Sequence, residues 1–417
     1  MNFAKDNKKK LIIIILLGFI SLILSAYLGE DALGGAKNDY LVHEKYIISF
    51  SENFNSALKE FGNNYEVRNS PVFFIYSSLF VKFGVNIDYL KYFNLLIILP
   101  LVIFFVKSLD IRFTNITIET KIFFTLVIFI SPTIRSLSAW PYPLSWAICF
   151  FVISIFYFLK FEKTKRKKKK LKYSLLNLLF LALSAYFTPN FGVFAAYFLF
   201  YFLKFFKFSR ESLLIILSNI LLSFPAIYFL ISKDFYLFKH EVNHVIDSYT
   251  IYDTLNISNK IVIITSIIFF FFIPFLQIKK MDHKIFSSKN GFIFIFIILN
   301  IYFYNFSEGL GGGLFYHLSN NLFNSPILLF AIFIISIFLF KEFKFLNFHN
   351  LFLFLIIIFY NIQSTIYYKY YDPVIYFMLL FLFKTDFNFN LKKVSTNYAL
   401  LYIFFLFISL GKKFIVY

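Results

Sequence analysis

The sequence predicts an all-helical (all-α), polytopic membrane protein. Of its 417 residues, 59% are hydrophobic, 24% are aromatic and 15% are charged, and the mean hydropathy is +0.73. Soluble domains carry about 25% charged residues, so this chain is too apolar to be one. Apolar runs recur along its whole length, and the first, of about 18 residues, is long enough to cross a bilayer as a helix.

The net charge of +19 does not indicate a nucleic-acid partner. Its densest block is KTKRKKKK at 163–170, between two apolar segments. The excess of lysine and arginine in cytoplasmic loops of membrane proteins explains this block. The one cysteine, Cys149, lies inside an apolar segment, so the sequence predicts no disulfide framework and no cysteine metal cluster.

The first apolar run, LIIIILLGFISLILSAYLG, follows the basic segment KDNKKK. It is longer than the apolar part of a secretory signal, and many further runs follow, so we expect an uncleaved span with its lysines in the cytoplasm. The next stretch, GGAKNDYLVHEKY at 34–46, then lies outside. It gathers five polar residues within nine positions: Lys37, Asp39, His43, Glu44 and Lys45.

Four apolar runs follow, at 71–83, 92–106, 122–134 and 139–160. The chain must return from the outside to the cytoplasm, which takes an odd number of crossings, so one run does not cross. The run at 71–83 is short and begins with Pro71, so we expect a re-entrant or interfacial helix there. The segment SPTIRSLSAWPYP at 131–143 is then predicted to be an outer loop.

Beyond residue 161, lysine-rich cytoplasmic loops alternate with outer loops poor in lysine. The predicted spans lie near 174–187, 190–207, 212–231, 259–278, 290–304, 324–340, 349–366, 374–385 and 397–411. The outer loops between them are 188–190, 232–258, 305–321 and 367–373. The total is about 13 transmembrane helices. Without an internal repeat or a Gly- or Ser-rich linker, we expect residues 1–417 to form a single membrane-embedded unit.

The first outer loop, residues 29–70, is the only sizeable segment outside the predicted spans. Six of its apolar residues recur at mostly three- and four-residue spacing, which predicts an amphipathic helix on the membrane surface. They are Tyr40, Ile47, Phe50, Phe54, Leu58 and Phe61.

Polar residues gather on the outer loops and at the outer ends of the spans. Charged groups close to the hydrocarbon are costly and tend to mark function. At the end of a span, however, Arg135 or Lys369 is equally well explained as reaching toward lipid headgroups. The candidates are Asp39, His43, Arg68, Asn69, Arg135, Trp140, Glu308, His317, Lys369, Tyr370 and Asp372.

Four segments resemble the C-type membrane glycosyltransferases, the superfamily of protein O-mannosyltransferases and lipid A aminoarabinose transferases. An acidic residue followed by tyrosine comes shortly after the first span, at Asp39 and Tyr40, and RNSPVFFIYSSLF opens a later helix. The NSP at 69–71 is similar to the His-Pro-Pro or Asn-Pro-Pro element of that superfamily. SPTIRSLSAWPYPLSWAICFF resembles its Ser-Pro segment, and YYKYYDP at 367–373 resembles its late Arg-Tyr and Pro segment.

The resemblance implies a polyprenyl-phosphate-linked sugar donor and transfer to an acceptor on the outer (periplasmic) face of the inner (plasma) membrane. A carboxylate accepts the proton of the acceptor while the sugar C1 bond to phosphate breaks. Asp39 is the candidate base, with Glu30 and Asp31 as alternatives. Cationic and hydrogen-bonding groups stabilise the leaving phosphate. The candidates for substrate binding are His43, Arg68, Asn69, Arg135, Glu308, Lys369, Tyr370 and Asp372.

The sequence also departs from the superfamily pattern. Many relatives carry a second acidic residue after the Ser-Pro segment, whereas SAWPYPLSW has none. Either Glu308 or Asp372 takes its place from another loop, or the activity has diverged. The superfamily includes enzymes that use a divalent metal, but no set of side chains here assembles a site for one, so we assign no cofactor.

Two other functions fit parts of the sequence. In KHEVNHVID, His240, Glu241 and His244 have the His-Glu-x-x-His spacing of a zinc protease, with Asp247 or Asp253 as a third ligand. The motif lies in a loop of fewer than 30 residues, where a short polar helix explains it as well. A lipid-linked glycan flippase has the same hydropathy, but transporters place polar residues in the middle of spans and often repeat their halves.

Overall fold

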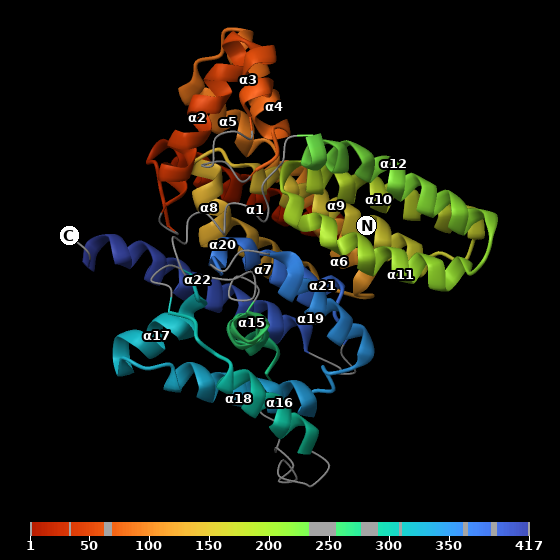
Figure 1. Cartoon of the computed structure of the whole chain (residues 1–417), viewed down its shortest axis with the longest axis vertical. Coiled ribbons are helices and arrows are strands. Elements are labelled where there is room, and N and C mark those ends of the chain that lie inside the picture. Colours follow the sequence, from red (N-terminus) through yellow and green to blue (C-terminus); the bar gives the residue numbers. More distant parts are fainter. Residues whose placement is uncertain are drawn as a thin grey trace. The chain divides into compact units, whose positions relative to one another are not determined.

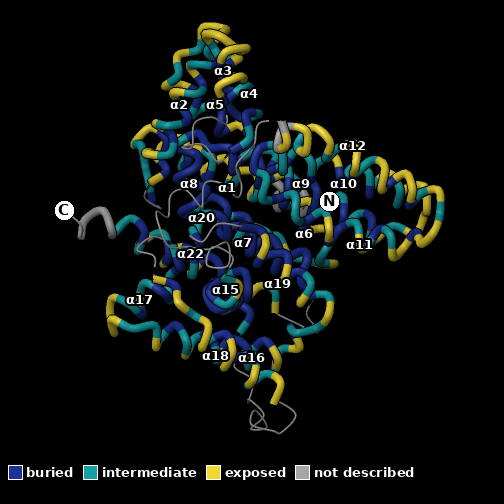
Figure 2. The backbone as a smooth tube through the Cα atoms, viewed as in Figure 1, coloured by how far each residue is buried: buried dark blue, intermediate teal, exposed yellow. Residues whose placement is uncertain are grey.

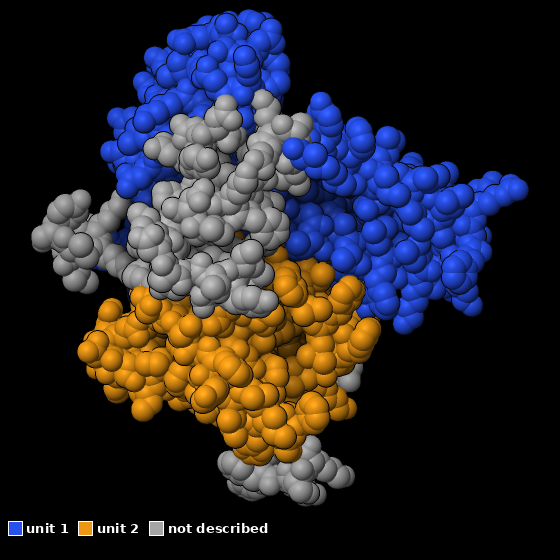
Figure 3. Space-filling view, viewed as in Figure 1, with its two compact units in different colours: residues 1–237, 391–417 blue, residues 238–390 orange. Residues whose placement is uncertain are grey.

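The computed structural model describes residues 2–32, 35–61, 69–232, 256–276, 291–307, 311–361, 366–384 and 390–415. Within these ranges the chain forms helices and no strand, which confirms the all-helical fold class (Figure 1). Contacts divide the chain into two compact units, residues 1–237 with 391–417 and residues 238–390 (Figure 3). That the whole chain works as a single unit stays a prediction.

Seven helical segments among the described residues are long and apolar enough to cross a membrane, and a bent pair of helices brings the number to eight. The seven are Lys9–Tyr27, Ile87–Arg112, Pro143–Lys163, Pro189–Phe206, Arg210–Tyr228, Ile257–Phe275 and Leu391–Gly411. Several other predicted spans form as shorter apolar helices: Gly291–Tyr302, Ile327–Lys341 and Phe348–Tyr360. The chain is therefore built as a membrane protein, whereas the count of about 13 spans is not confirmed.

Unit 1 holds the helices from both ends of the chain. They are α1 (Asn2–Tyr27), α2 (Ala36–Glu52), α3 (Phe54–Glu60), α4 (Val72–Lys82), η1 (Ile87–Tyr89), α5 (Leu90–Leu95), α6 (Ile98–Arg112), α7 (Ile118–Ile130), α8 (Pro132–Ala139), α9 (Pro143–Lys163), α10 (Lys167–Phe187), η2 (Pro189–Val193), α11 (Phe194–Phe206), α12 (Arg210–Ser232) and α22 (Leu391–Ile415). The buried helix α9 packs against α6 and α10 (Figure 2). Asn177 of α10 crosses to Ser154 of α9, with its side chain donating to both oxygens of the serine, at 2.7 and 2.9 Å.

The first half of the segment 131–143 is not a loop, because residues 132–139 form the buried helix α8. Its position on the outer side stays a prediction. Ser131 breaks the path of the chain, and α7 and α8 meet there at a bend of 50°. The Ser131 side chain accepts from the backbone N–H of Ile134, and Pro132 occupies the first turn of α8. A serine cap followed by proline is typical of a helix start, although the same two residues are also common in loops.

The amphipathic helix predicted in the first outer loop is present as α2 and the short α3. Tyr40, Ile47 and Phe50 are buried on one face of α2, which packs against α4. Asn53 separates α2 from α3, and Phe54, just beyond the break, is exposed. Helix α4 is too short to count as a span, as the run at 71–83 predicted. The apolar face of α2 is thus covered by protein.

Unit 2 is arranged around α15 (Ile257–Phe272), seen end-on in Figure 1. Its other elements are η3 (Ile273–Phe275), α16 (Gly291–Tyr302), α17 (Gly313–Phe323), α18 (Ile327–Glu342), α19 (Phe348–Tyr360), α20 (Tyr368–Tyr371) and α21 (Val374–Phe381). Asn259, near the start of α15, contacts Asn305. Phe272, at its end, packs against Phe340 and Phe345. Asn305, from a predicted outer loop, therefore lies at one end of α15, and the turn between Phe340 and Phe345 lies at the other.

Candidate functional site

Three segments far apart in the sequence meet in unit 1, at the end of α1, the first half of α2 and the end of α8. We call this region the junction. It is defined by Glu30, Asp31, Lys37, Asp39, Tyr40, His43, Asn69, Arg135, Trp140 and Tyr142. Four of the predicted site residues belong to it: Asp39, His43, Asn69 and Arg135.

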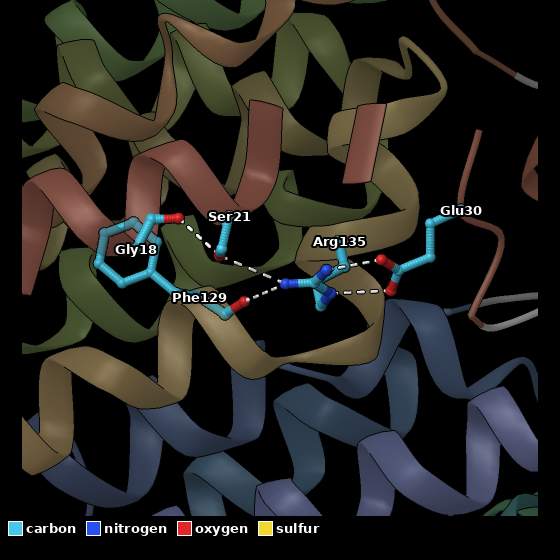
Figure 4. A network of polar contacts seen from close by, with 5 residues as sticks. All are labelled: Gly18, Ser21, Glu30, Phe129 and Arg135. Carbon is cyan, nitrogen blue, oxygen red and sulfur yellow. Dashed lines mark hydrogen bonds and ion pairs between the residues drawn. The ribbon is translucent and has the colours of Figure 1, made fainter. Parts of the chain in front are cut away.

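Arg135 of α8 forms an ion pair with Glu30, just beyond the end of α1 (Figure 4). Its Nε donates to Glu30 Oε1 at 2.8 Å, and Nη2 donates to Oε2 at 2.6 Å. Nη1 donates to the Phe129 carbonyl at 3.3 Å and to Ser21 Oγ at 3.4 Å. The exposed fractions of the Arg135 and Glu30 side chains are 14% and 10%. Two parallel bonds at low exposure make this a strong, geometrically specific contact.

The same contact explains how the bend between α7 and α8 is held. The last carbonyls of a helix have no partner within it, and Arg135 supplies one to Phe129, near the end of α7. Gly18 lets α1 approach closely, because an added Cβ there would lie 2.4 Å from the Phe129 ring. Ser21, one turn on, donates to the Gly18 carbonyl at 2.7 Å. Small residues on α1 and a charged side chain on α8 thus fix the bend together.

Glu30, Asp31 and Asp39, the three carboxylates between the end of α1 and the start of α2, differ in their surroundings. Glu30 is held by Arg135, and Asp31 accepts the backbone N–H groups of Ala36 and Lys37, at 3.3 and 3.4 Å, at the start of α2. Asp39 lies in the first turn of α2 and is half-buried. Glu30 is therefore paired with a cation, and Asp31 holds the backbone at the start of α2. Asp39 stays the candidate base because the resemblance assigns that role to it.

His43 is one helical turn after Asp39 on the same side of α2. Its ring is buried, and its Nε2 is 3.3 Å from the side-chain amide nitrogen of Asn69. Since an amide nitrogen only donates, His43 Nε2 accepts. Three aromatic rings surround the imidazole, with centroid distances of 6.1 Å to Phe73, 5.2 Å to Phe74 and 4.9 Å to Tyr142. Two of the predicted substrate-binding residues, His43 and Asn69, are thus in direct contact.

Trp140 brings the end of α8 against the start of α2. Its ring centroid is 6.0 Å from that of Tyr40, and Lys37 Nζ is 5.7 Å from the indole centroid. The Tyr40 hydroxyl donates to the Ile87 carbonyl at 3.4 Å. Burial, with smaller contributions from the carboxylates of Glu44 and Asp88, raises the pKa of Tyr40 above its ordinary value, so this hydroxyl stays protonated.

Three predicted substrate-binding residues that the structure describes, and the further candidate His317, belong to unit 2. Lys369 and Tyr370 are in α20, with Lys369 Nζ 5.5 Å from the Tyr367 centroid and 5.7 Å from that of Tyr370. Asp372 follows α20 and is fully buried. His317 is in α17, beside the Tyr316 ring. The remaining candidates lie outside the described residues: Arg68, Glu308, His240, Glu241, His244, Asp247 and Asp253.

Lys260, which is buried in the first turn of α15, is not among the residues predicted from the sequence. Its Nζ donates to the Asn361 carbonyl, just after α19, at 2.9 Å. Beside it, Asn259 and Asn305 exchange two hydrogen bonds of 2.8 and 2.9 Å. In the sequence, a lysine next to an apolar run is typical of the membrane surface. Its burial depends on the contact with Asn361, which is about 100 residues away in the chain.

The described residues hold no group of three or more His, Cys, Asp or Glu side chains that could bind a metal ion. No family model, no curated protein and no solved structure matches the chain. The function is therefore argued from the residues of the junction.

Proposed function

We propose that the protein is a membrane glycosyltransferase that moves a sugar from a polyprenyl-phosphate donor to an acceptor at the outer face of the inner (plasma) membrane. One observation supports this most. Three of the four segments that resemble C-type glycosyltransferases, around Asp39, Asn69 and Trp140, are separated by up to about 100 residues and pack together in the junction. Segments that serve one reaction need such proximity.

Asp39 acts as the general base in the proposed reaction. Its carboxylate accepts the proton of the acceptor hydroxyl or amine while the acceptor atom bonds to C1 of the sugar. The bond between C1 and the phosphate oxygen breaks, and polyprenyl phosphate leaves with the electron pair. The apolar polyprenyl chain stays in the bilayer. His43, held by Asn69, lies one turn from Asp39 on the same side of α2.

In this proposal Arg135 has a structural role and does not bind the phosphate of the donor. Because Glu30 already balances its charge, we assign it to holding α8, and so Trp140 and Tyr142, in place. The leaving phosphate needs another cation, since developing negative charge requires a donor that is available to it. Lys37 is exposed and lies in the junction, two positions before Asp39.

The experiment is turnover of radiolabelled donors by the purified full chain in lipid nanodiscs. The panel contains polyprenyl phosphates that carry a hexose, an N-acetylhexosamine or an aminopentose. We expect release of polyprenyl phosphate from at least one donor, with loss of turnover in Asp39→Asn and retention in His240→Ala. Failure with every donor, together with transport of a lipid-linked glycan, would favour a flippase. Loss of activity only in His240→Ala would favour zinc chemistry.

A further inference from the structure

The two tryptophans of the chain, Trp140 and Trp146, have contrasting environments. Trp146 is held within the fold: its Nε1 donates to Asn94 Oδ1 at 2.9 Å, and its ring stacks on Phe187 at 5.4 Å. The Trp140 ring is partly exposed, whereas its Nε1 is buried and has no hydrogen-bond partner among the described residues. An unmade bond of this kind costs about 1–3 kcal/mol, so packing alone does not account for this indole.

Residues from two other segments hold the Trp140 ring in place. Gly29 lies close to its benzene ring, because an added Cβ there would be 3.4 Å from Trp140 Cζ2. Gly29 also has a φ of +62°, which disfavours any larger residue. Tyr40 and Lys37 approach the indole from α2. The ring is thus fixed by the end of α1 and the start of α2, with an exposed ammonium beside it.

We propose that Trp140 and Lys37 bind the sugar-phosphate end of the donor, an inference that rests on the proposed function. The C–H face of a pyranose ring lies on the indole, which is apolar on its faces and polar at its N–H. The Lys37 ammonium binds the phosphate next to C1. An aromatic face beside a cation matches a ligand in which a ring and an anion are adjacent.

Lys37 of this pair lies on the same short stretch of α2 as Asp39. Lys37 and Tyr40 both reach Trp140, and Asp39 lies between them in the first turn of α2. Residues two apart on a helix point to different sides, so the sugar of a donor held by Trp140 and Lys37 must extend around this turn to bring its C1 to Asp39. The alternative is that Trp140 anchors the fold in the headgroup region, as interfacial tryptophans do.

Fluorescence of Trp140 tests the proposal directly. In the Trp146→Phe full chain, Trp140 is the only tryptophan. The protein in nanodiscs is titrated with the radiolabelled polyprenyl-phosphate sugar that it turns over, and with the same polyprenyl phosphate lacking the sugar. We expect a saturable change in Trp140 emission with the sugar-bearing lipid and a clearly smaller one without the sugar. Equal changes with both lipids would contradict the proposal that the sugar lies on Trp140.

Two substitutions separate the roles. Lys37→Gln is exposed and should fold normally, and we expect it to weaken binding of both lipids about tenfold. Lys45→Gln, an equally exposed lysine of α2, is the matched control and should bind as wild type. Trp140→Leu should lose the preference for the sugar-bearing lipid. Trp140→Phe, which keeps a ring, should recover part of that preference.

The outcomes distinguish this inference from the proposed function. If the wild-type chain neither binds nor turns over any donor, both the proposed function and this inference fail. If it turns over a donor while Trp140 emission stays constant and Lys37→Gln binds as tightly as Lys45→Gln, the transferase stands and the Trp140–Lys37 site is wrong. An anchoring role predicts that Trp140→Leu lowers thermal stability and leaves the preference for the sugar unchanged.

Discussion

Arg135 and Glu30, 105 residues apart in the sequence, form two parallel hydrogen bonds of 2.8 and 2.6 Å that join α8 to the end of α1. The contact fixes the α7–α8 bend, and the chain after α8 carries Trp140 and Tyr142 to α2. The position of the aromatic residues next to the proposed base therefore depends on an ion pair that touches neither of them.

Removal of either partner of this pair should destabilise unit 1. Arg135→Ala and Glu30→Ala each leave a poorly solvated charge, and we expect each to lower the free energy of unfolding by about 1.5–3 kcal/mol. The double variant should lose less than the sum of the two. Thermal unfolding of the purified protein measures this. Asp110→Ala, which breaks the more exposed pair with Lys121, is the control and should have a smaller effect. Strict additivity would contradict a direct coupling.

The close approach of α1 and α7 makes Gly18 sensitive to a single methyl group. In Gly18→Ala the new Cβ overlaps the buried Phe129 ring, and we expect a loss of about 1–3 kcal/mol. Gly411→Ala in α22 is the matched control, because its Cβ meets nothing within 4 Å. That variant should be neutral or slightly stabilising, since alanine favours a helix. Equal melting temperatures of the two variants would show that α1 and α7 are not packed as described.

The contact between His43 and Asn69 should be specific for an amide. Asn69→Leu removes the donor to the buried imidazole and should cost about 1–3 kcal/mol. Asn69→Gln, which retains an amide, should recover part of the lost turnover and stability. Asn38→Leu, at an exposed position of α2, is the control for the substitution itself. The idea fails if Asn69→Leu melts and turns over donor like Asn38→Leu.

Lys260 should be dispensable for stability and needed for activity. Replacing a buried charged group by an apolar side chain of similar size is often neutral or stabilising. We therefore expect Lys260→Met to melt no lower than wild type while donor turnover falls, because charged residues buried next to spans tend to be functional. Lys341→Met, at an exposed lysine of unit 2, should change neither property. A lower melting temperature with normal turnover would make Lys260 structural.

The sequence predicted the parts of the fold that depend on periodicity. The spacing of Tyr40, Ile47 and Phe50 identified the buried face of α2, and the apolar runs identified the long helices. It did not predict α8, because Ser131 and Pro132 are typical of both a loop and a helix start. The partnership of Glu30 with Arg135 and the burial of Lys260 depend on contacts between distant segments, which spacing along the chain does not contain.

Donor turnover in Asp39→Asn, compared with Glu52→Gln, tests the central claim most directly. Both variants neutralise a carboxylate of α2, at opposite ends of the helix. A general base contributes about 10²- to 10⁴-fold to a rate, so Asp39→Asn should lose turnover by that factor with its donor affinity largely kept. Glu52→Gln should react as wild type. Equal rates in the two variants would contradict the assignment of Asp39 and the mechanism that depends on it.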